Sequence, residues 1–246
     1  MIKIVHQIWL GNAPMPENYK IFRQQWQEVN PDWEFKLWTE KEIEAEVWDN
    51  QGIYDDIAIP PEGKRSHEIA VATQRSDIIR YEILYRYGGM YLDCDIEPIK
   101  TLSYMFNKYP ESKYKASASN ENTVYVNGEL PNENNTQYLL VNNNFLWAPS
   151  KHMEFWKLCI EKLASSFDKL TVIPESTGPH MVSYVAYQNP SLIYVYPYSA
   201  FNYVQWVDIP IGMDAKFEKD KLPDDVIAVH HYGHRKNYRP NTSWTS

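Results

Sequence analysis

The pattern of apolar and polar positions changes its period several times along this chain. Residues 2–8 are rich in β-branched side chains and end at a Trp-Leu-Gly turn, which predicts a first strand. Apolar side chains then recur at helical spacing over 19–29 and alternate with polar ones over 33–38. Thr39 and Glu42 have the spacing of a capping box, which predicts that another helix begins there. This order of strand, helix, strand and helix predicts an α/β sandwich whose strands are mostly parallel.

The longest helical pattern covers 66–87 and leads to an unusual acidic stretch. A glycine pair follows the helix, in the position that a C-terminal cap favours. Residues 90–92 then predict a short central strand that ends at Asp93-Cys94-Asp95. Farther along, the sequence predicts a polar surface loop or a ragged hairpin over 120–135, strands over 141–147 and 226–229, a helix over 153–167, and a helix that begins at Gly178-Pro179.

Composition narrows the class of protein. A chain of 246 residues is long enough to bury a large core, and we expect a single domain over 1–246. No run approaches the roughly 18 to 20 apolar residues that span a bilayer, and the beginning lacks a secretory signal, so we expect a cytoplasmic location. With 24 basic and 32 acidic residues, a net charge of −8 and no basic block, nucleic acid is excluded as a partner. Cys94 and Cys159 support neither a disulfide framework nor a zinc cluster.

Two carboxylates at the end of a predicted central strand are the first candidates for chemistry. Alternation along a strand places Asp93 and Asp95 on the same side and turns Cys94 away. Two carboxylates on one side suit a hard cation such as Mg²⁺ or Mn²⁺, which keeps positions free for phosphate oxygens. The alternative is a solvated acidic turn, because an Asp-x-Asp pattern alone is a weak signal.

A second polar pair precedes this motif. Asp77 and Arg80 are three positions apart on the predicted helix, so they share a face, and an exposed ion pair would be the ordinary explanation. However, the whole run RSDIIRYEILYRYGGMYLDCDI resembles the donor-site signature of glycosyltransferase family 32, the sugar-nucleotide transferases. The resemblance extends to the opening IKIVHQIWLG, the segment VNNNFLWAPSKH, the triplet Thr177-Gly178-Pro179 and the tail with Ser243-Trp244.

The resemblance implies a GT-A fold, a Rossmann-like nucleotide-binding sandwich, and a set of donor-binding residues. In this family pattern Trp9 stacks on the base of the nucleotide, and Ser76 and Tyr91 lie beside it. Asp77 and Arg80 match the pair that grips the donor sugar.

The resemblance also implies a divalent metal, Mn²⁺ or Mg²⁺, and a lid. Asp95 is expected to bind the metal directly, whereas Asp93 is expected to contact the ribose and the sugar and to share in the metal site. The tail over 230–246 is expected to close over the donor, with Ser243 near the metal and Trp244 against the β-phosphate.

For two pairs of adjacent residues, the sequence does not decide which member belongs to the site. His230 or His231, at the end of the predicted strand over 226–229, is expected to complete the metal shell, with His230 preferred. Asn143 or Asn144 is expected to face the donor sugar, with Asn143 preferred. A one-residue error in register would exchange the two asparagines.

The expected reaction is transfer of a hexosyl or N-acetylhexosaminyl unit from a nucleoside-diphosphate sugar, a UDP-sugar first of all, to an acceptor hydroxyl with retention of configuration. The expected acceptors are a glycan or lipid-linked glycan of capsular or exopolysaccharide synthesis, and then a glycoprotein. Any association with a membrane is expected to be peripheral.

Two other functions compete with this one. A haloacid-dehalogenase-like, Mg²⁺-dependent phosphatase also ends a strand with Asp-x-Asp, but there the motif stands near the start of the fold. A non-catalytic carbohydrate-binding protein is suggested by the 9 Trp and 19 Tyr residues. Against it, Trp26, Phe35 and Trp156 fall in periodic segments and are better explained as core.

Overall fold

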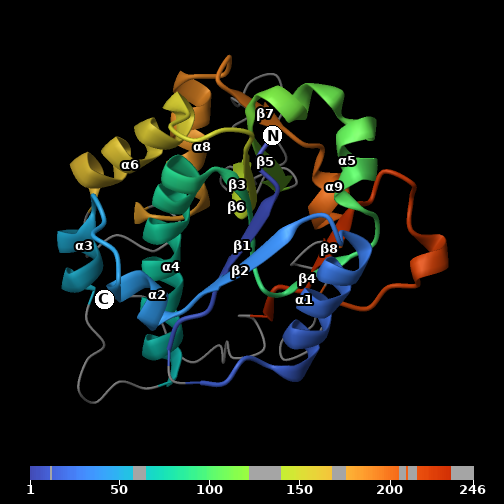
Figure 1. The fold of residues 1–246 in the computed structure, drawn as a ribbon, viewed down its shortest axis with the longest axis horizontal. Helices are drawn as coiled ribbons and strands as arrows, with labels where there is room; N and C mark the ends of the chain where they lie inside the picture. Colours follow the sequence, from blue (N-terminus) through green and yellow to red (C-terminus); the bar gives the residue numbers. More distant parts are fainter. Residues whose placement is uncertain are drawn as a thin grey trace.

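A twisted sheet runs through the centre of the molecule, with helices on both faces (Figure 1). The computed structural model describes residues 1–11, 13–57, 65–121, 140–167, 176–204, 209 and 215–233. These residues form a six-stranded sheet in the order β2-β1-β3-β6-β5-β7 and a two-stranded sheet of β4 and β8. The strands are β1 (Ile4–Ile8), β2 (Glu34–Trp38), β3 (Gly89–Leu92), β4 (Ile96–Pro98), β5 (Ala116–Glu121), β6 (Leu140–Ala148), β7 (Ile193–Val195) and β8 (Ala228–His230).

The helices follow the predicted pattern closely where the apolar periodicity is strong. The predicted capping box is present, because Thr39 and Glu42 exchange hydrogen bonds at the start of α2. The strand that was predicted over 226–229 begins later and takes in His230. The helices are α1 (Glu17–Val29), α2 (Glu40–Glu44), α3 (Gln51–Asp56), α4 (Arg65–Tyr87), α5 (Leu102–Lys108), α6 (Glu154–Ser166), α8 (Pro179–Gln188) and α9 (Tyr198–Asn202), with short 3₁₀ turns η1 (Pro110–Tyr114) and η3 (Lys219–Lys221).

Strand direction confirms a mostly parallel sheet and adds one reversal. β1 is parallel to β2 and β3, and β5 is parallel to β7. β6 is antiparallel to both of its neighbours, β3 and β5. Because of this reversal, the amino end of β6 lies at the same edge of the sheet as the carboxyl ends of β1 and β3.

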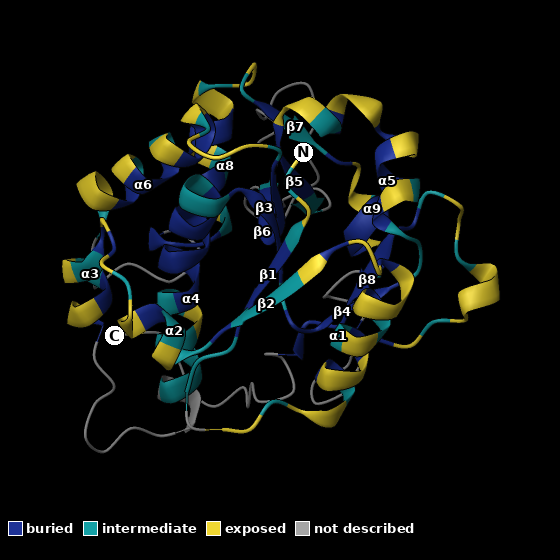
Figure 2. Ribbon diagram, in the orientation of Figure 1, coloured by how far each residue is buried: buried dark blue, intermediate teal, exposed yellow. Residues whose placement is uncertain are grey.

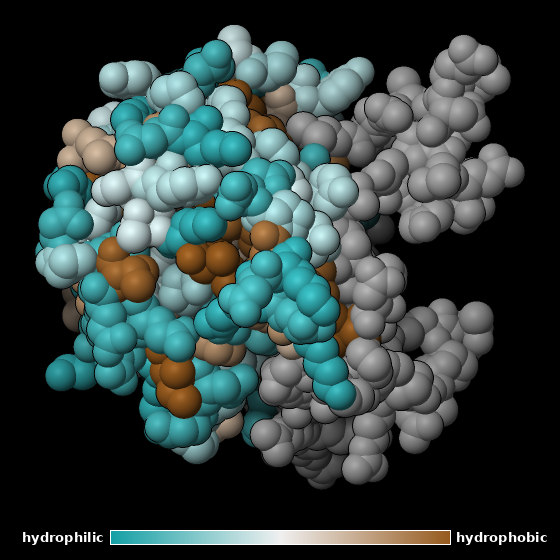
Figure 3. Space-filling view, turned by 90° about the vertical axis from the view of Figure 1, so that its right-hand side faces the viewer, coloured by the Kyte–Doolittle hydropathy of each residue, from teal (hydrophilic) through white to brown (hydrophobic). Residues whose placement is uncertain are grey.

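Two hydrophobic layers hold the helices against the sheet. On one face, α4, α6 and α8 pack with sheet residues such as Leu146 and Ile193. On the other face, α1, α5 and α9 pack around Leu92 and Phe145. Figure 2 shows the result: the inner strands and the inner helix faces are buried, the edge strand β2 is mostly of intermediate burial, and the outer helix faces are exposed. The side of the molecule drawn in Figure 3 is mainly hydrophilic, with its apolar side chains in separate spots.

The structure bears on the predicted absence of a membrane span, and it leaves the predicted single domain and lid as predictions. No helix in the described parts of the chain is long and apolar enough to cross a membrane. The single domain over 1–246 stays a prediction. So does the lid over 230–246, because residues 234–246 lie outside the described residues.

The glycine pair after α4 makes the sharp turn that brings β3 into the sheet. Gly88 and Gly89 have positive φ values of 66° and 87°, a backbone conformation that disfavours side chains. A Cβ on Gly89 would lie 2.5 Å from the carbonyl oxygen of Ile4 in the neighbouring strand. The close approach of β1 to β3 therefore depends on this residue having no side chain.

We predict that Gly89→Ala lowers the free energy of unfolding by about 2 kcal/mol or more, through backbone strain and the clash with β1. Gly52→Ala is the matched control, because Gly52 lies within α3 with nothing within 4 Å of an added Cβ. It should raise stability by about 0.5 to 1 kcal/mol. Urea unfolding of both variants measures the difference, and equal effects would contradict this role of Gly89.

Candidate active site

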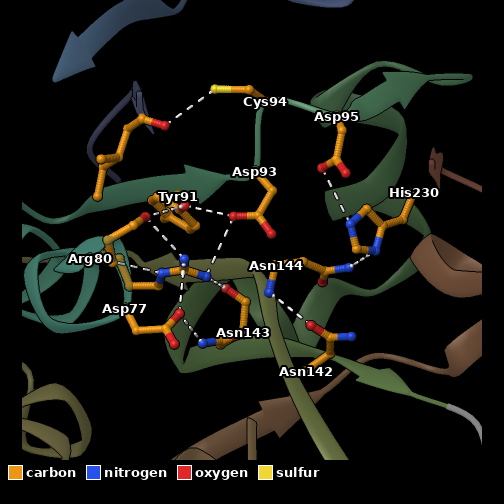
Figure 4. A network of polar contacts seen from close by, with 12 residues as sticks. Asp77, Arg80, Tyr91, Asp93, Cys94, Asp95, Asn142, Asn143, Asn144 and His230 are labelled. Carbon is orange, nitrogen blue, oxygen red and sulfur yellow. Dashed lines mark hydrogen bonds and ion pairs between the residues drawn. The ribbon is translucent and has the colours of Figure 1, made fainter. Parts of the chain in front are cut away.

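The functional side chains gather at the edge where β3 ends and β6 begins (Figure 4). Asp93 follows β3 directly, and its backbone N–H donates to the carbonyl of Asn144 on β6 at 2.9 Å. Asp95 precedes β4, and His230 ends β8, the partner strand of β4. The structure therefore brings Asp93 and Asp95 to one side, as predicted, while the Cys94 thiol turns away and donates to the carbonyl of Ile8 at 3.4 Å.

A buried arginine joins this edge to helix α4. Arg80 lies between two carboxylates, 3.0 Å from Asp77 and 3.4 Å from Asp93. Its guanidinium also donates to the carbonyl of Asn143 at 2.6 Å and packs over the ring of Tyr91 at 4.4 Å. Asp77 and Arg80 are each only 3% exposed, so the exposed-ion-pair explanation of this pair is wrong.

Two further members of the predicted donor set, Ser76 and Tyr91, belong to this network. Ser76 Oγ accepts from Arg80 at 3.1 Å and lies 3.4 Å from the hydroxyl of Tyr91. Tyr91 in turn donates to Asp93 at 2.6 Å. Ser76, Asp77, Arg80, Tyr91 and Asp93, all selected from the sequence, thus share one continuous set of contacts.

Asp77 is held by residues from three separate elements. Besides Arg80, it accepts from the side-chain amide of Asn143 at 2.9 Å and from the hydroxyl of Thr177 at 3.0 Å. Tyr81, one turn along α4, contacts the same Asn143 amide and donates to the Thr177 carbonyl. Burial raises the pKa of Asp77 to about 6, although the Arg80 charge and these hydrogen bonds oppose the rise.

Two carboxylates and one imidazole form a second group beside the arginine. One ligand atom from each of Asp93, Asp95 and His230 lies within 4.8 Å of the others. Nε2 of His230 is 3.2 Å from Asp95, while its Nδ1 is 2.8 Å from the Asn144 amide nitrogen. The second carboxylate oxygen of Asp95 accepts from the backbone N–H of Gly233 at 2.7 Å. These oxygen and nitrogen donors fit a divalent cation.

The pKa values of Asp93 and His230 are shifted because charged groups lie close together in this cluster. Burial raises the pKa of Asp93, a rise that Arg80 opposes and that the Asp95 charge reinforces. Burial alone would lower the pKa of His230, but the neighbouring carboxylates, Asp95 first, outweigh burial and raise it. An added positive ion would relieve the excess of negative charge here.

Strand alternation separates the three asparagines of β6. Asn143 points to α4 and bonds Asp77, whereas Asn144 points to the opposite face of the sheet and lies against His230. Asn142, on the same face as Asn144, donates to Glu121 at 3.1 Å. Asn143 is therefore the member of the pair that lies with Asp77 and Arg80.

The two adjacent histidines also differ in their surroundings. His231 stacks on Phe22 at 4.7 Å between ring centres and lies 3.0 Å from Glu97. Its backbone N–H donates to the carbonyl of Asp95. His231 thus supports the loop that carries Asp95, and His230 is the one whose ring joins the acidic group.

The structure describes the predicted base-stacking residue, Trp9, but not the predicted lid residues Ser243 and Trp244. Trp9 follows β1 at this same edge, is partly buried, and donates through its ring N–H to the carbonyl of Ala13 at 2.9 Å. Its ring meets that of Tyr19 edge-on at 6.1 Å. Ser243 and Trp244 lie outside the described residues, so their roles stay predictions.

Sequence reasoning missed a polar cluster on the α9 side of the sheet. The Asn144 side chain donates to Asn202 and accepts from Ser119, and Tyr232 also donates to Asn202. Glu121, at the end of β5, is close enough for its charge to act on His230. The alternation of small and polar residues along β5 was the available signal, but it does not reveal which strand stands opposite.

The α/β sandwich, with its mostly parallel six-stranded sheet and an Asp-x-Asp at the carboxyl edge, has the features of the GT-A class of glycosyltransferase folds. Solved structures agree with this class. The PaToxG glycosyltransferase superposes with a TM-score of 0.55 at 14% identity, over 77% of this chain and 70% of that one. Mouse xyloside xylosyltransferase 1 gives 0.50 at 10% identity, over 94% and 98%. At such identities the likeness concerns the fold alone.

The family resemblance is confirmed. Residues 16–115 match the family described as "Glycosyltransferase sugar-binding region containing DXD motif", a stretch that includes Asp93 and Asp95. Inositol phosphoceramide mannosyltransferase 3 of Schizosaccharomyces pombe is 32% identical over 117 residues, 48% of this chain and 30% of the relative. Mannosyl phosphorylinositol ceramide synthase CSH1 of Saccharomyces cerevisiae is 33% identical over 93 residues, 38% and 22%. The chain thus matches less than a third of each relative's length.

We predict that Arg80→Ala lowers the free energy of unfolding by roughly 3 to 5 kcal/mol, because it leaves the buried Asp77 and the partly buried Asp93 without their cation. Adding Asp77→Asn should restore part of the loss, since one of those charges is then gone. Lys157→Ala, which removes an exposed ion pair with Glu161 on α6, is the control and should change nothing measurable. Unfolding midpoints that fall equally for Arg80 and Lys157 would contradict the role assigned to Arg80.

Proposed function

We propose that this chain is a metal-dependent, retaining glycosyltransferase that moves a hexosyl or N-acetylhexosaminyl unit from a nucleoside-diphosphate sugar, a UDP-sugar first, to an acceptor hydroxyl. One observation carries the proposal: Asp93 contacts Arg80 on one side and belongs to the Asp95–His230 group on the other. The proposed sugar-binding pair and the proposed cation site would therefore share a single carboxylate. A nucleoside-diphosphate sugar needs a hydrogen-bonding group for its sugar and a cation for its diphosphate, and these two parts of the molecule are directly bonded.

Donor binding is assigned to residues on both sides of Asp93. Trp9 stacks on the base, and Ser76 and Tyr91 line the nucleotide. Asp77 and Arg80 offer a carboxylate acceptor and guanidinium donors to the sugar hydroxyls, and Asn143 holds Asp77 in place at 2.9 Å. Charged partners of this kind make stronger hydrogen bonds than neutral ones.

The cation is assigned to Asp95 and His230, with Asp93 beside them and Ser243 from the tail. A bound Mn²⁺ or Mg²⁺ would stabilise the negative charge that grows on the departing diphosphate. The residues themselves orient the donor and exclude water, and Trp244 closes over the β-phosphate in this proposal. Exclusion of water favours transfer over hydrolysis of the donor.

Retention is proposed to occur by attack on the same face from which the diphosphate leaves. The acceptor oxygen bonds to the anomeric carbon, the bond from that carbon to the diphosphate oxygen breaks, and the acceptor proton passes to the diphosphate. The contacts of the nearest carboxylates support this route over a covalent one. Asp77 already accepts from Arg80 and Asn143 at one oxygen and from Thr177 at the other, which weakens it as a nucleophile. The fourth acceptor position of the carboxylate is the one proposed for a sugar hydroxyl.

The acceptor is proposed to be a hydroxyl of a lipid-linked glycan, as in capsular or exopolysaccharide synthesis, ahead of a glycan or glycoprotein. The curated relatives are named for transfer of mannose to inositol phosphoceramide, so a lipid acceptor and a mannose donor both enter the tests. A cytoplasmic location stays a prediction.

The two competing functions lose support. In a phosphatase of the haloacid-dehalogenase type Asp93 would be the nucleophile, yet it is held by Tyr91 and Arg80. In a carbohydrate-binding protein aromatic rings should face solvent, yet Trp26 and Trp156 are fully buried.

We predict that the protein releases nucleoside diphosphate from one member of a donor panel of UDP-glucose, UDP-galactose, their N-acetyl forms and GDP-mannose when Mn²⁺ is present. Asp95→Ala should lower the rate by about 100-fold or more, as removal of a group that stabilises transition-state charge does. Asp49→Ala, an exposed aspartate paired with Arg86, is the control. Release of inorganic phosphate from simple phosphoesters, with no use of any donor, would overturn the proposal.

We predict that the affinity for Mn²⁺ falls as the pH is lowered below the raised pKa of His230, because protons compete with the metal for the ring nitrogen. The loss should approach about tenfold per pH unit, and His230→Ala should bind more weakly with a shallower slope. Free Mn²⁺, counted by its paramagnetic resonance signal, measures this. The same slope in His230→Ala would remove His230 from the metal site.

A further inference from the structure

An apolar cavity lies between helix α8 and strand β7. Its volume is about 610 Å³, within the range of roughly 300 to 1,000 Å³ that small-molecule sites occupy. It is on the same face of the sheet as α4, which carries Asp77 and Arg80. The lining includes Leu140, Val141, Tyr184, Ala186, Ile193 and Val195.

The cavity begins next to the candidate sugar site. Val141 lines it and points to the same face of β6 as Asn143, about 7 Å along the strand. At the other wall, His180 lies in the first turn of α8, shortly after Thr177, which bonds Asp77. The backbone N–H of Val141 donates to Ser183 on α8 at 2.8 Å, so the two walls are tied together.

The chemistry of the lining selects the class of ligand. Among the described lining residues there is no Asp, Glu, Lys or Arg, and the hydroxyl of Ser183 is occupied by Val141 and by the carbonyl of Pro179. The other polar side chains of the lining, His180, Tyr184 and Tyr187, are exposed, so the inner walls are apolar. Sugar hydroxyls or a peptide backbone would stay unpaired against such walls, at a cost in free energy. An alkyl chain needs no such partners.

The rim suits a molecule that is apolar at one end and polar at the other. Tyr184 and Tyr187 line the cavity and are 51% and 63% exposed. Tyrosine places an apolar ring against a hydrocarbon while its hydroxyl meets water. At the Val141 end of the cavity, the polar head of a bound alkyl chain would lie toward Asn143, two residues along β6.

We propose that this cavity holds the alkyl chain of the lipid-linked acceptor while the acceptor hydroxyl reaches the edge at Asp77 and Asn143. The inference rests on the proposed function and makes it specific, because it selects a lipid-linked acceptor over a free glycan or a glycoprotein. The acceptor is recognised through its alkyl chain, so the binding affinity depends on the length of that alkyl chain.

The test uses a fluorescent alkyl probe, dansyl-undecanoic acid, displaced by hexyl, octyl and decyl glucoside below their micelle concentrations. Affinity should rise by about fourfold for each added methylene, the factor expected for burial of one such group. Val195→Trp fills the cavity, and Tyr184→Glu places a charge at its rim. Each should weaken binding at least about tenfold. Tyr114→Glu is the matched control, because Tyr114 is 81% exposed and does not line the cavity.

UDP binding in the presence of Mn²⁺ is measured on the same four proteins, since it reports the donor site separately. Affinity that does not depend on chain length, or that survives in both cavity variants, overturns the inference even where UDP binds normally. Binding to phosphatidylcholine vesicles without binding of the monomeric probe also overturns it, because the face would then be a membrane contact. Failure of the wild type to bind either UDP or GDP, measured in the same way, overturns the proposed function itself.

Discussion

The candidate site depends on one buried guanidinium that is shared by two carboxylates. Arg80 lies within ion-pair distance of Asp77 on its own helix and of Asp93 at the end of β3, and the arginine and Asp77 are almost fully buried. Removing Asp77 fully and Asp93 in part from water without a cation would cost several kcal/mol, so both carboxylates depend on the charge of Arg80. Because Arg80 also bonds the backbone of β6, helix α4 and the two strands keep a fixed spacing at this edge.

The reversed strand β6 explains how two neighbouring residues, Asn143 and Asn144, can contact both the Asp77–Arg80 pair and the His230 side of the site. Its amino end lies beside the carboxyl end of β3, and its side chains alternate between the two faces of the sheet. Asn143 therefore serves the arginine side and Asn144 the histidine side. The same alternation points Val141 into the apolar cavity, so one strand links the sugar pair, the cation group and the cavity.

Local signals predicted much of this arrangement. The capping box at Thr39, the long helix over 66–87 and the strand that ends at Asp93 depend on residues near one another in sequence, and they were found. The reversal of β6 was not predicted, because alternation has the same period in either direction. The partnership of Asp77 with Thr177 joins residues 100 apart, and the contact of Asn144 with His230 joins residues 86 apart. Such contacts arise when the two hydrophobic layers pack against the sheet, and a pattern of residues close together in sequence carries no information about them.

The central claim is that the cation group and the sugar pair act as one site for a nucleoside diphosphate. Isothermal titration of UDP into the protein, with and without Mn²⁺ and on the wild type and Asp95→Ala, tests it most directly. The claim predicts one UDP bound per chain with Mn²⁺, and loss of that binding when either the metal or the Asp95 carboxylate is removed. Equal affinity for UDP without the metal, or in Asp95→Ala, would contradict it.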